Sequence, residues 1–176
     1  MQILHTKRLD LIALSQEQLQ RYLAQPAELE RELGFPISRE ILTERAQRAI
    51  RMKLAKLAQC EEERAEWYTY WLVVVRAVPF GAGLIGFKGI PDQNGEAEIG
   101  YGIDPAYQQQ GYTTEAVRWM ITWAFEEAAC RAVVARDTKK WNLASQRVLA
   151  KVGMSVYQES EDALWMRVER GETKRL

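Results

Sequence analysis

The sequence predicts a mixed α/β fold in a single domain that spans residues 1–176. Charged, helix-forming residues dominate the first third of the chain, and aromatic and β-branched segments follow from Trp67. Residues 96–137 have the pattern of strand, helix and strand, which places two strands parallel through a crossover. The strands before this unit are joined by short turns, so we expect them to pair antiparallel.

The first third of the chain carries signals for one strand and three helices. Ser15 followed by Gln18 has the spacing of a capping box, in which each side chain bonds the other residue's backbone amide. Pro26 and Gly34 suit the first position and the end of a second helix. Ser38 precedes a segment of helix-forming residues with apolar positions at helical spacing. The expected elements are a strand over 8–14 and helices over 15–24, 26–34 and 39–64.

The remainder of the chain alternates between apolar segments and turn signals. Residues 67–78 are aromatic and β-branched, which favours a strand. Turn-forming residues at 91–95 separate two further strands, and Gly153 ends the last helix. The expected elements are strands over 67–78, 83–90 and 96–103, a helix over 113–129, a strand over 131–137, a helix over 142–151 and a hairpin over 155–160 and 163–170.

Composition and charge exclude several functional classes. The chain has 24 Lys and Arg and 24 Asp and Glu, so its formal net charge of zero argues against binding nucleic acid by bulk electrostatics. No apolar run is long enough to span a membrane, and the first residues lack the apolar core of a secretory signal, so we expect a cytoplasmic protein. His5 is the only histidine, and Cys60 and Cys130 lie far apart, so we expect no metal site and no His-based triad.

Residues 81–86, Gly-Ala-Gly-Leu-Ile-Gly, match the G-x-G-x-x-G pattern of dinucleotide-binding proteins. That pattern holds a pyrophosphate only where a helix begins directly after it. The residues that follow are apolar, contain another glycine and end at Pro91, so they continue as a strand. We therefore expect no nicotinamide cofactor, and we interpret these glycines as points of close backbone approach.

A second glycine loop lies in a better context for binding an anion. The strand over 96–103 runs into a loop, and a helix begins at Thr113. A helix start presents unpaired backbone amides and a partial positive charge, and Gly111 allows a sharp turn there. Thr113 and Thr114 also suit an ordinary cap. The residues alone leave both interpretations open, a phosphate site and a capped helix start.

Three segments resemble the GNAT superfamily of N-acetyltransferases. QQQGYT fits that family's R/Q-x-x-G-x-G/A loop, with Gln108 first, Gly111 fourth and Thr113 sixth. Residues 142–154, NLASQRVLAKVGM, resemble its N-x-x-S-x-x-x-x-x-K-x-G-F segment. Residues 6–11, TKRLDL, are similar to the opening of the branch that contains the ribosomal-protein N-terminal (alanine) acetyltransferases. The segments occur in the order of the family and extend over essentially the whole chain.

The resemblance implies a seven-stranded mixed sheet with a central splay between two parallel strands, 96–103 and 131–137, flanked by about four helices. It implies acetyl-CoA as co-substrate, with the pantetheine arm in the splay near Ile103 and the pyrophosphate on the amides of the loop. The residues thereby assigned to the cofactor are Ile103, Gln108, Gln109, Gln110, Gly111, Tyr112, Thr113 and Asn142. Thr113 departs from the family's Gly or Ala, and glutamines replace loop positions that often carry Arg or Lys. We therefore expect cofactor affinity to depend weakly on salt through this loop.

Glu98 and Ser145 are the candidate catalytic residues. In a regular strand Glu98 shares a face with Gly100 and Gly102, which leave room for a substrate, and partial burial is expected to raise its pKa toward that of a useful general base. By resemblance, Ser145 lies near the sulfur as acid or thiolate stabiliser and Asn142 bonds the pantetheine. Both residues also suit a helix cap. Tyr101, on the face opposite Glu98, is interpreted as a core residue.

The function implied is acetyl-CoA-dependent transfer of an acetyl group to a primary amine, by direct attack in a ternary complex. The acceptor stays open between a protein or peptide N-terminus and a small amine, and a non-catalytic acyl-CoA-binding sensor is the alternative. The expected partners are acetyl-CoA and the amine, without nucleic acid or membrane. Trp119 and Trp123, four residues apart on one helix, are either a buried pair or a contact surface for a homodimer.

Overall fold

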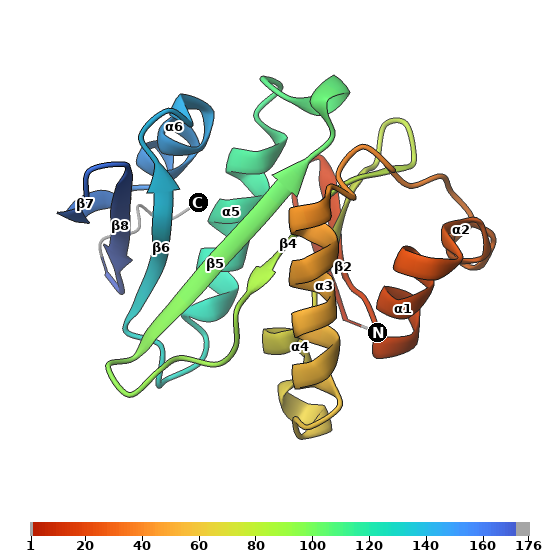
Figure 1. Cartoon of the computed structure of the whole chain (residues 1–176), viewed down its shortest axis with the longest axis horizontal. Helices are drawn as coiled ribbons and strands as arrows, with labels where there is room; N and C mark the ends of the chain where they lie inside the picture. The colour runs from red at the N-terminus through yellow and green to blue at the C-terminus, as the bar shows by residue number, and fades with distance from the viewer. Residues whose placement is uncertain (1, 172–176) are drawn as a thin grey trace.

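The computed structural model describes residues 2–171 and places one eight-stranded sheet among six α-helices (Figure 1). The strands are β1 (Ile3–His5), β2 (Leu9–Ala13), β3 (Trp71–Val75), β4 (Phe80–Phe87), β5 (Glu96–Ile103), β6 (Ala132–Lys139), β7 (Ser155–Glu159) and β8 (Ala163–Glu169). The helices are α1 (Gln16–Ala24), α2 (Pro26–Leu33), α3 (Glu44–Leu57), α4 (Ala65–Tyr68), α5 (Tyr112–Ala124) and α6 (Leu143–Lys151). Within the described residues no helix is both long and apolar enough to cross a membrane.

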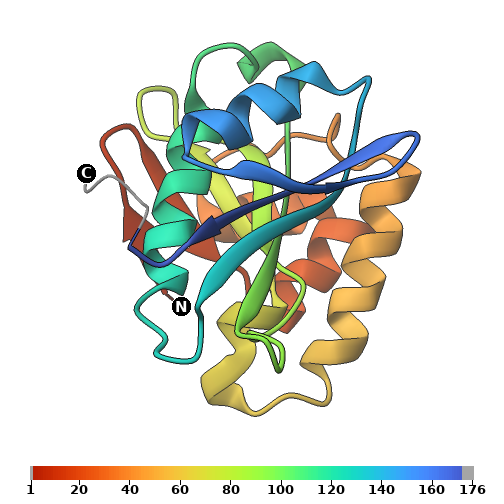
Figure 2. The ribbon, with the colours of Figure 1, turned by 90° about the vertical axis from the view of Figure 1, so that its left-hand side faces the viewer.

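The sheet has the order β1-β2-β3-β4-β5-β6-β8-β7 and is covered by helices on both faces (Figures 1 and 2). Alternate residues of β3 show this division. Trp71 and Val73 pack in a core with α5 and α6, whereas Leu72 and Val74 pack in a second core with α1, α2 and α3. Trp123 on α5 lies against Trp67, with ring centroids 4.6 Å apart, so this member of the predicted tryptophan pair packs inward.

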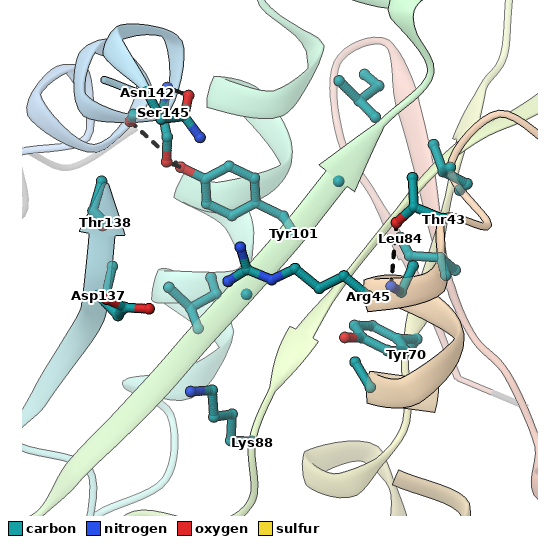
Figure 3. A pocket seen from close by; sticks show the side chains of 18 of the residues that line it. Thr43, Arg45, Tyr70, Leu84, Lys88, Tyr101, Asp137, Thr138, Asn142 and Ser145 are labelled. Carbon is teal, nitrogen blue, oxygen red and sulfur yellow. Dashed lines mark hydrogen bonds between the residues drawn. The ribbon is translucent and has the colours of Figure 1, made fainter. Parts of the chain in front are cut away.

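The central strands β5 and β6 are parallel for only three residue pairs, ending at Glu98 and Val134. Beyond that point β5 stays beside β4 as far as Ile103, whereas β6 stays beside β8. The register of β6 shifts between Ala135 and Thr138, and such a bulge bends a strand. The sheet therefore opens into a wedge, with Tyr101 on one side and Thr138 on the other (Figure 3). This confirms the predicted splay between two parallel strands.

Most predicted elements are present, and the local signals account for them. Ser15 and Gln18 form both bonds of the capping box, and Gly34 ends α2 in a left-handed conformation with φ of 81°. The segment that matched a dinucleotide fingerprint lies inside β4, as expected from its apolar continuation. Two counts differ from the expectation. A short strand, β1, pairs with β2 and makes eight strands instead of seven, and the helices number six within the described residues instead of about four.

The predicted helix over 39–64 is wrong at both ends. Thr43 caps α3, whereas the Ser38 hydroxyl donates to the Asp104 carboxylate at 2.6 Å and joins two loops. α3 ends at Leu57, because the glutamates at 61–63 oppose the negative end of a helix dipole and instead begin a new helical turn. The predicted strand over 67–78 is also too long, since Trp67 lies in α4.

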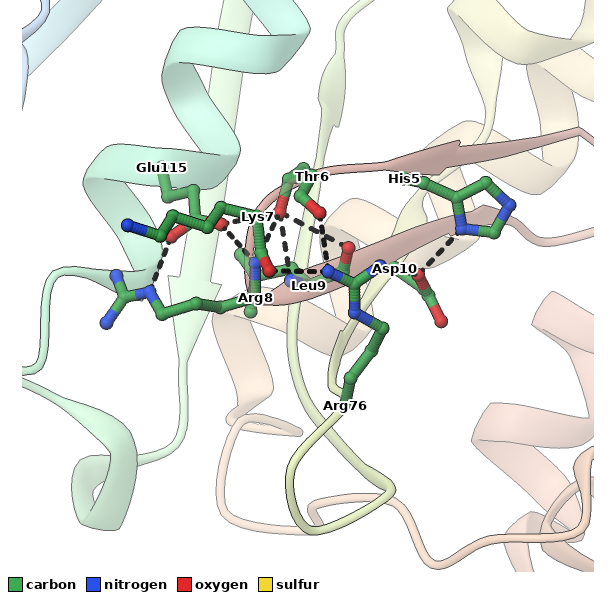
Figure 4. A network of polar contacts seen from close by, with 8 residues as sticks. All are labelled: His5, Thr6, Lys7, Arg8, Leu9, Asp10, Arg76 and Glu115. Atoms are coloured by element: carbon green, nitrogen blue, oxygen red, sulfur yellow. Dashed lines mark hydrogen bonds and ion pairs between the residues drawn. The ribbon is translucent and has the colours of Figure 1, made fainter.

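The segment between β1 and β2 is fastened to the start of α5 by one carboxylate (Figure 4). Glu115 accepts hydrogen bonds from the Thr6 hydroxyl at 2.6 Å and from the backbone amide and guanidinium of Arg8 at 2.8 and 2.7 Å. Arg8 also donates to the carbonyl of Gln110 at 2.9 Å and lies over the ring of Tyr112. The TKRL segment noticed in the sequence therefore positions the loop between β5 and α5.

We expect Gly83→Ala to destabilise the fold, because a Cβ atom there would lie 2.6 Å from the carbonyl oxygen of Gly102 across the β4–β5 pair. Backbone cannot move aside as a flexible side chain can, so the loss should be about 1–3 kcal/mol in urea unfolding. Gly100→Ala is the matched control, because its Cβ would have no other atom within 4 Å. Equal stability of the two variants would contradict this reading of the strand pair.

The Glu115 network makes a prediction for pH. Burial favours a raised pKa for the Glu115 carboxyl, but the hydrogen bonds from Thr6 and Arg8 outweigh it and hold the pKa below its ordinary value of 4.5. Because the folded pKa is lowered, the carboxylate stabilises the fold above its unfolded pKa, and this contribution is lost as the pH falls through the folded pKa. Glu115→Gln should therefore cost about 1–3 kcal/mol at pH 7 and progressively less as the pH falls below 4.5.

The control is Glu126→Gln, an exposed glutamate just after α5. Urea unfolding of the wild type and both variants at pH 7 and pH 3.5 measures the difference. A constant penalty for Glu115→Gln across this range would show that the charge of the carboxylate does not matter.

Candidate active site

A cavity of about 830 Å³ opens where β5 and β6 separate. Its walls come from α3, β5, the end of β6 and the start of α6. Five of the residues predicted to be catalytic or cofactor-binding line it, and they come from segments far apart in the chain: Glu98, Ile103, Gln108, Asn142 and Ser145. The remaining predicted cofactor residues, 109–113, follow Gln108 directly and form the end of the loop and the first two residues of α5.

The loop before α5 leaves its backbone amides free. Gly111 is the N-cap residue with φ of 80°, and Gln109 also has a positive φ of 59°. Within residues 2–171, the amides of residues 109–114 have no hydrogen-bond acceptor, whereas that of Gln108 reaches the Pro105 carbonyl at 3.3 Å. No side chain caps α5, so the suggested cap by Thr113 or Thr114 is wrong. These amides and the helix dipole point to an anion site.

The sequence indicated no positive charge in this loop, and the fold supplies one. The guanidinium of Arg8 bonds the Gln110 carbonyl, and its Nη2 atom would lie 3.3 Å from a Cβ atom added at Gly111. Arg8 stands about a hundred residues earlier in the chain, so the local pattern of three glutamines could not reveal it. The signal available was the TKRL segment, whose structural role becomes visible only in three dimensions.

Asn142 and Ser145 begin α6 on the other side of the wedge. The Asn142 side-chain oxygen accepts from the Ser145 amide at 3.1 Å, so Asn142 does cap its helix. The Ser145 hydroxyl lies 2.8 Å from the hydroxyl of Tyr101, which reaches toward α6 from β5 (Figure 3). Tyr101 packs against the core as expected, but it also lines the cavity. Burial raises the pKa of Tyr101 to about 12, so its hydroxyl keeps its proton near neutral pH.

Glu98 lies at the last paired position of β5, where the wedge begins. Its side chain is 14% exposed and faces two cations. The Lys88 ammonium lies 2.5 Å from one carboxylate oxygen, and the Arg136 guanidinium lies 3.7 Å from the other. Both cations lie within ion-pair distance of the carboxylate, a pairing that the strand pattern alone did not indicate.

One whole wall of the cavity was missed in the sequence. No role is predicted from the sequence for the charged residues of α3, but Arg45, Arg48, Lys53 and Lys56 line the cavity. Figure 3 shows Arg45 reaching from α3 across β5 toward Tyr101. Burial, with a smaller contribution from the charge of Lys56, lowers the pKa of Lys53 to about 7. An amphipathic pattern identifies a polar helix face but cannot tell open solvent from a cavity.

Residues 8–155 match the model of the GNAT acetyltransferase domain. An uncharacterized N-acetyltransferase from Bacillus subtilis, YjdG, is 33% identical over 92 residues, which cover 52% of this chain and 54% of that protein. A second, YnaD from the same organism, is 35% identical over 57 residues, 32% of this chain and 33% of that protein. The chain thus matches about half or less of the length of these relatives.

Solved structures with the same fold align over nearly the whole chain. A ribosomal-protein-S5-alanine acetyltransferase from Vibrio fischeri has a TM-score of 0.68 at 18% identity, covering 99% of this chain and 100% of that chain. A RimL ribosomal α-N-protein acetyltransferase in complex with coenzyme A has a TM-score of 0.66 at 17% identity, covering 96% and 98%. The fold, the wedge with its free amides and the match of the family model lead to one assignment: the chain belongs to the GNAT acetyltransferase family, whose co-substrate is acetyl-CoA.

Proposed function

We propose that this protein transfers the acetyl group of acetyl-CoA directly to a primary amine while both substrates are bound. The amine nitrogen attacks the thioester carbonyl carbon, the carbon–sulfur bond breaks, the amine loses a proton and the departing thiolate gains one. The observation that carries the proposal is the cavity that opens between β5 and β6 beside a loop with free amides. Neither Cys60 nor Cys130 lines this cavity, which favours direct attack over an acetyl-cysteine intermediate.

Acetyl-CoA would bind with its pyrophosphate on the amides of residues 109–113 and its pantetheine arm in the wedge. The edge of β5 that faces β6 has no partner strand from Ile99 to Ile103, so its backbone groups are available to the amides of pantetheine. Within residues 2–171 the Asn142 side-chain nitrogen donates to no acceptor, so it is free to bond a pantetheine carbonyl while the oxygen caps α6. The Arg8 guanidinium, which pairs with Glu115 through Nε, would present its Nη2 beside the pyrophosphate.

Glu98 and Ser145 would handle the two protons. An ionised carboxylate at Glu98 can accept a proton from the amine, directly or through one water molecule. Ser145 would donate to the thiolate, and the adjacent Tyr101 hydroxyl can return a proton to Ser145 across the 2.8 Å contact. Tyr101 would thereby act as a proton relay to Ser145, in addition to its place in the core.

We expect Gly111→Ala to weaken acetyl-CoA binding by about tenfold, a loss of about 1.4 kcal/mol. The added Cβ would strain a residue with φ of 80° and lie 3.3 Å from Arg8, which displaces the amides that face the pyrophosphate. Gly34→Ala is the matched control, since Gly34 has φ of 81° with open space around it at the end of α2. Calorimetry that finds the same Kd for both variants would show that the loop does not bind the cofactor.

Glu98→Gln and Ser145→Ala separate an enzyme from a sensor. We expect each to lower kcat by about a hundredfold while the Kd for acetyl-CoA changes less than about twofold, because each acts on a proton and not on the cofactor. Glu126→Gln and Ser155→Ala, both exposed, serve as controls. The measurement is release of free coenzyme A thiol with peptides, amino acids and polyamines as acceptors. A wild-type protein that binds acetyl-CoA but releases no thiol with any amine would be a sensor.

A further inference from the structure

The cavity carries a strong local charge although the whole chain has none. Seven Lys and Arg residues and three Asp and Glu residues line it. Even with Lys53, whose pKa is about 7, counted as neutral, they leave an excess of three positive charges. Over the whole chain the two kinds are equal at 24 each. Charges gathered on the walls of a concave site create a potential that selects for ligands of the opposite sign. The excess of positive charge therefore influences which ligands can enter the cavity.

The cations on the sheet side are neutralised by protein carboxylates. Lys88 pairs with Glu98, and Lys139 lies 2.7 and 2.9 Å from the carboxylates of Asp137 and Asp162. Arg136 pairs with Glu96 at 2.6 Å. These three residues hold strand ends and the Glu98 carboxylate in place, so they leave little charge for a ligand.

The cations on α3 are not neutralised. Within residues 2–171, Arg45 and Arg48 form no hydrogen bond and no ion pair. Lys53 donates to the backbone carbonyls of Tyr68 and Phe87, and Lys56 donates to that of Lys88, so neither meets a carboxylate. The four lie at helical spacing on the face of α3 that borders the cavity. The uncompensated charge is thus confined to one wall.

The α3 wall lies on the opposite face of the sheet from the loop that would bind the pyrophosphate. α3 and α5 cover opposite faces of the sheet, and the loop of residues 109–113 leads into α5 (Figures 1 and 2). The pyrophosphate would therefore be bound at the α5 side of the wedge, and the α3 wall would face the acceptor. A cationic acceptor such as a polyamine would be repelled there, whereas an acceptor with a carboxylate or phosphate would be attracted.

We propose that the acceptor is an anionic amine, a primary amine that carries a carboxylate or phosphate group, and that Arg45 and Arg48 bind this group. The inference rests on the proposed acetyl transfer and specifies its substrate class. The same cations favour the neutral form of the bound amine, since a positive environment disfavours an ammonium ion. Attraction of the anionic group and loss of the ammonium proton therefore act together in preparing the nucleophile.

Matched acceptors test the charge preference. Peptides with Asp or Glu at their second and third positions are compared with the same peptides carrying Asn or Gln, and with Lys. 4-Aminobutyrate, 4-aminobutanamide and putrescine form the corresponding small-molecule series, with a carboxylate, an amide or a second ammonium on the same chain of carbons, and this series distinguishes a peptide source of the charge from a small amine. We expect kcat/KM to be about tenfold higher for the anionic member than for its neutral partner, and the advantage to shrink with added salt.

Substitutions on α3 test whether Arg45 and Arg48 cause the preference for an anionic acceptor. Arg45→Gln with Arg48→Gln should remove most of the preference for the anionic acceptor and leave the Kd for acetyl-CoA unchanged. Arg51→Gln is the control, since Arg51 is an exposed arginine of the same helix that does not line the cavity. Equal rates for anionic, neutral and cationic acceptors would overturn the inference and leave acetyl transfer intact.

If no acceptor in the panel reacts, measurements of peptide binding still test the inference. The anionic peptide should then bind the protein loaded with coenzyme A more tightly than its neutral counterpart, and the double variant should abolish the difference. Equal binding, or binding unaffected by the double variant, would overturn the inference. Failure of the proposed function itself has separate signatures, either the absence of acetyl-CoA binding in calorimetry or binding of acetyl-CoA without release of thiol for any acceptor.

Discussion

The structure depends on the early end of the pairing between β5 and β6. Only three residue pairs hold these strands together, and every later backbone group on the facing edge of β5 lacks a strand partner. An open sheet edge in the interior of a protein is normally covered, because buried amides and carbonyls need partners. In the proposed complex, this edge would pair with the amides of pantetheine. The cavity, the free loop and the position of Glu98 at the point of divergence all follow from this break in the ladder.

The fold could be predicted largely from local signals. Capping at Ser15, the glycine at 34 and the regular strand over 96–103 are decided by neighbouring residues, and the structure reproduces them. The errors fell where a distant contact decides the conformation. Ser38 resembles a helix cap in sequence, but its hydroxyl is used by Asp104, 66 residues away. β1 is too short to show an alternating pattern and is fixed by its pairing with β2.

The residues of the candidate site also fall into two groups, those that belong to local sequence motifs and those that are placed by distant contacts. The loop around Gly111 and the Asn142–Ser145 segment have recognisable motifs, and the fold brings both to the wedge. Three residues contact these motifs or Glu98 only after the chain has folded, so their contacts could not be predicted from the sequence. They are Arg8, Lys88 and Tyr101. The α3 wall is the largest omission. Its pattern of charges is compatible with any solvated helix, and only the placement of α3 beside the cavity gives it a different meaning.

The hydrogen bonds from Thr6 and Arg8 to Glu115, which join the β1–β2 turn to α5, have a practical consequence. Arg8 and Thr6 hold Glu115 in the first turn of α5, so the hairpin at the start of the chain supports the loop with the free amides. A fusion partner or affinity tag attached ahead of Ile3 would be joined directly to β1, and so to the β1–β2 hairpin that positions this loop. Tethering the protein through a surface distant from the hairpin would spare it. Immobilised preparations for binding measurements are therefore best anchored away from the first strand.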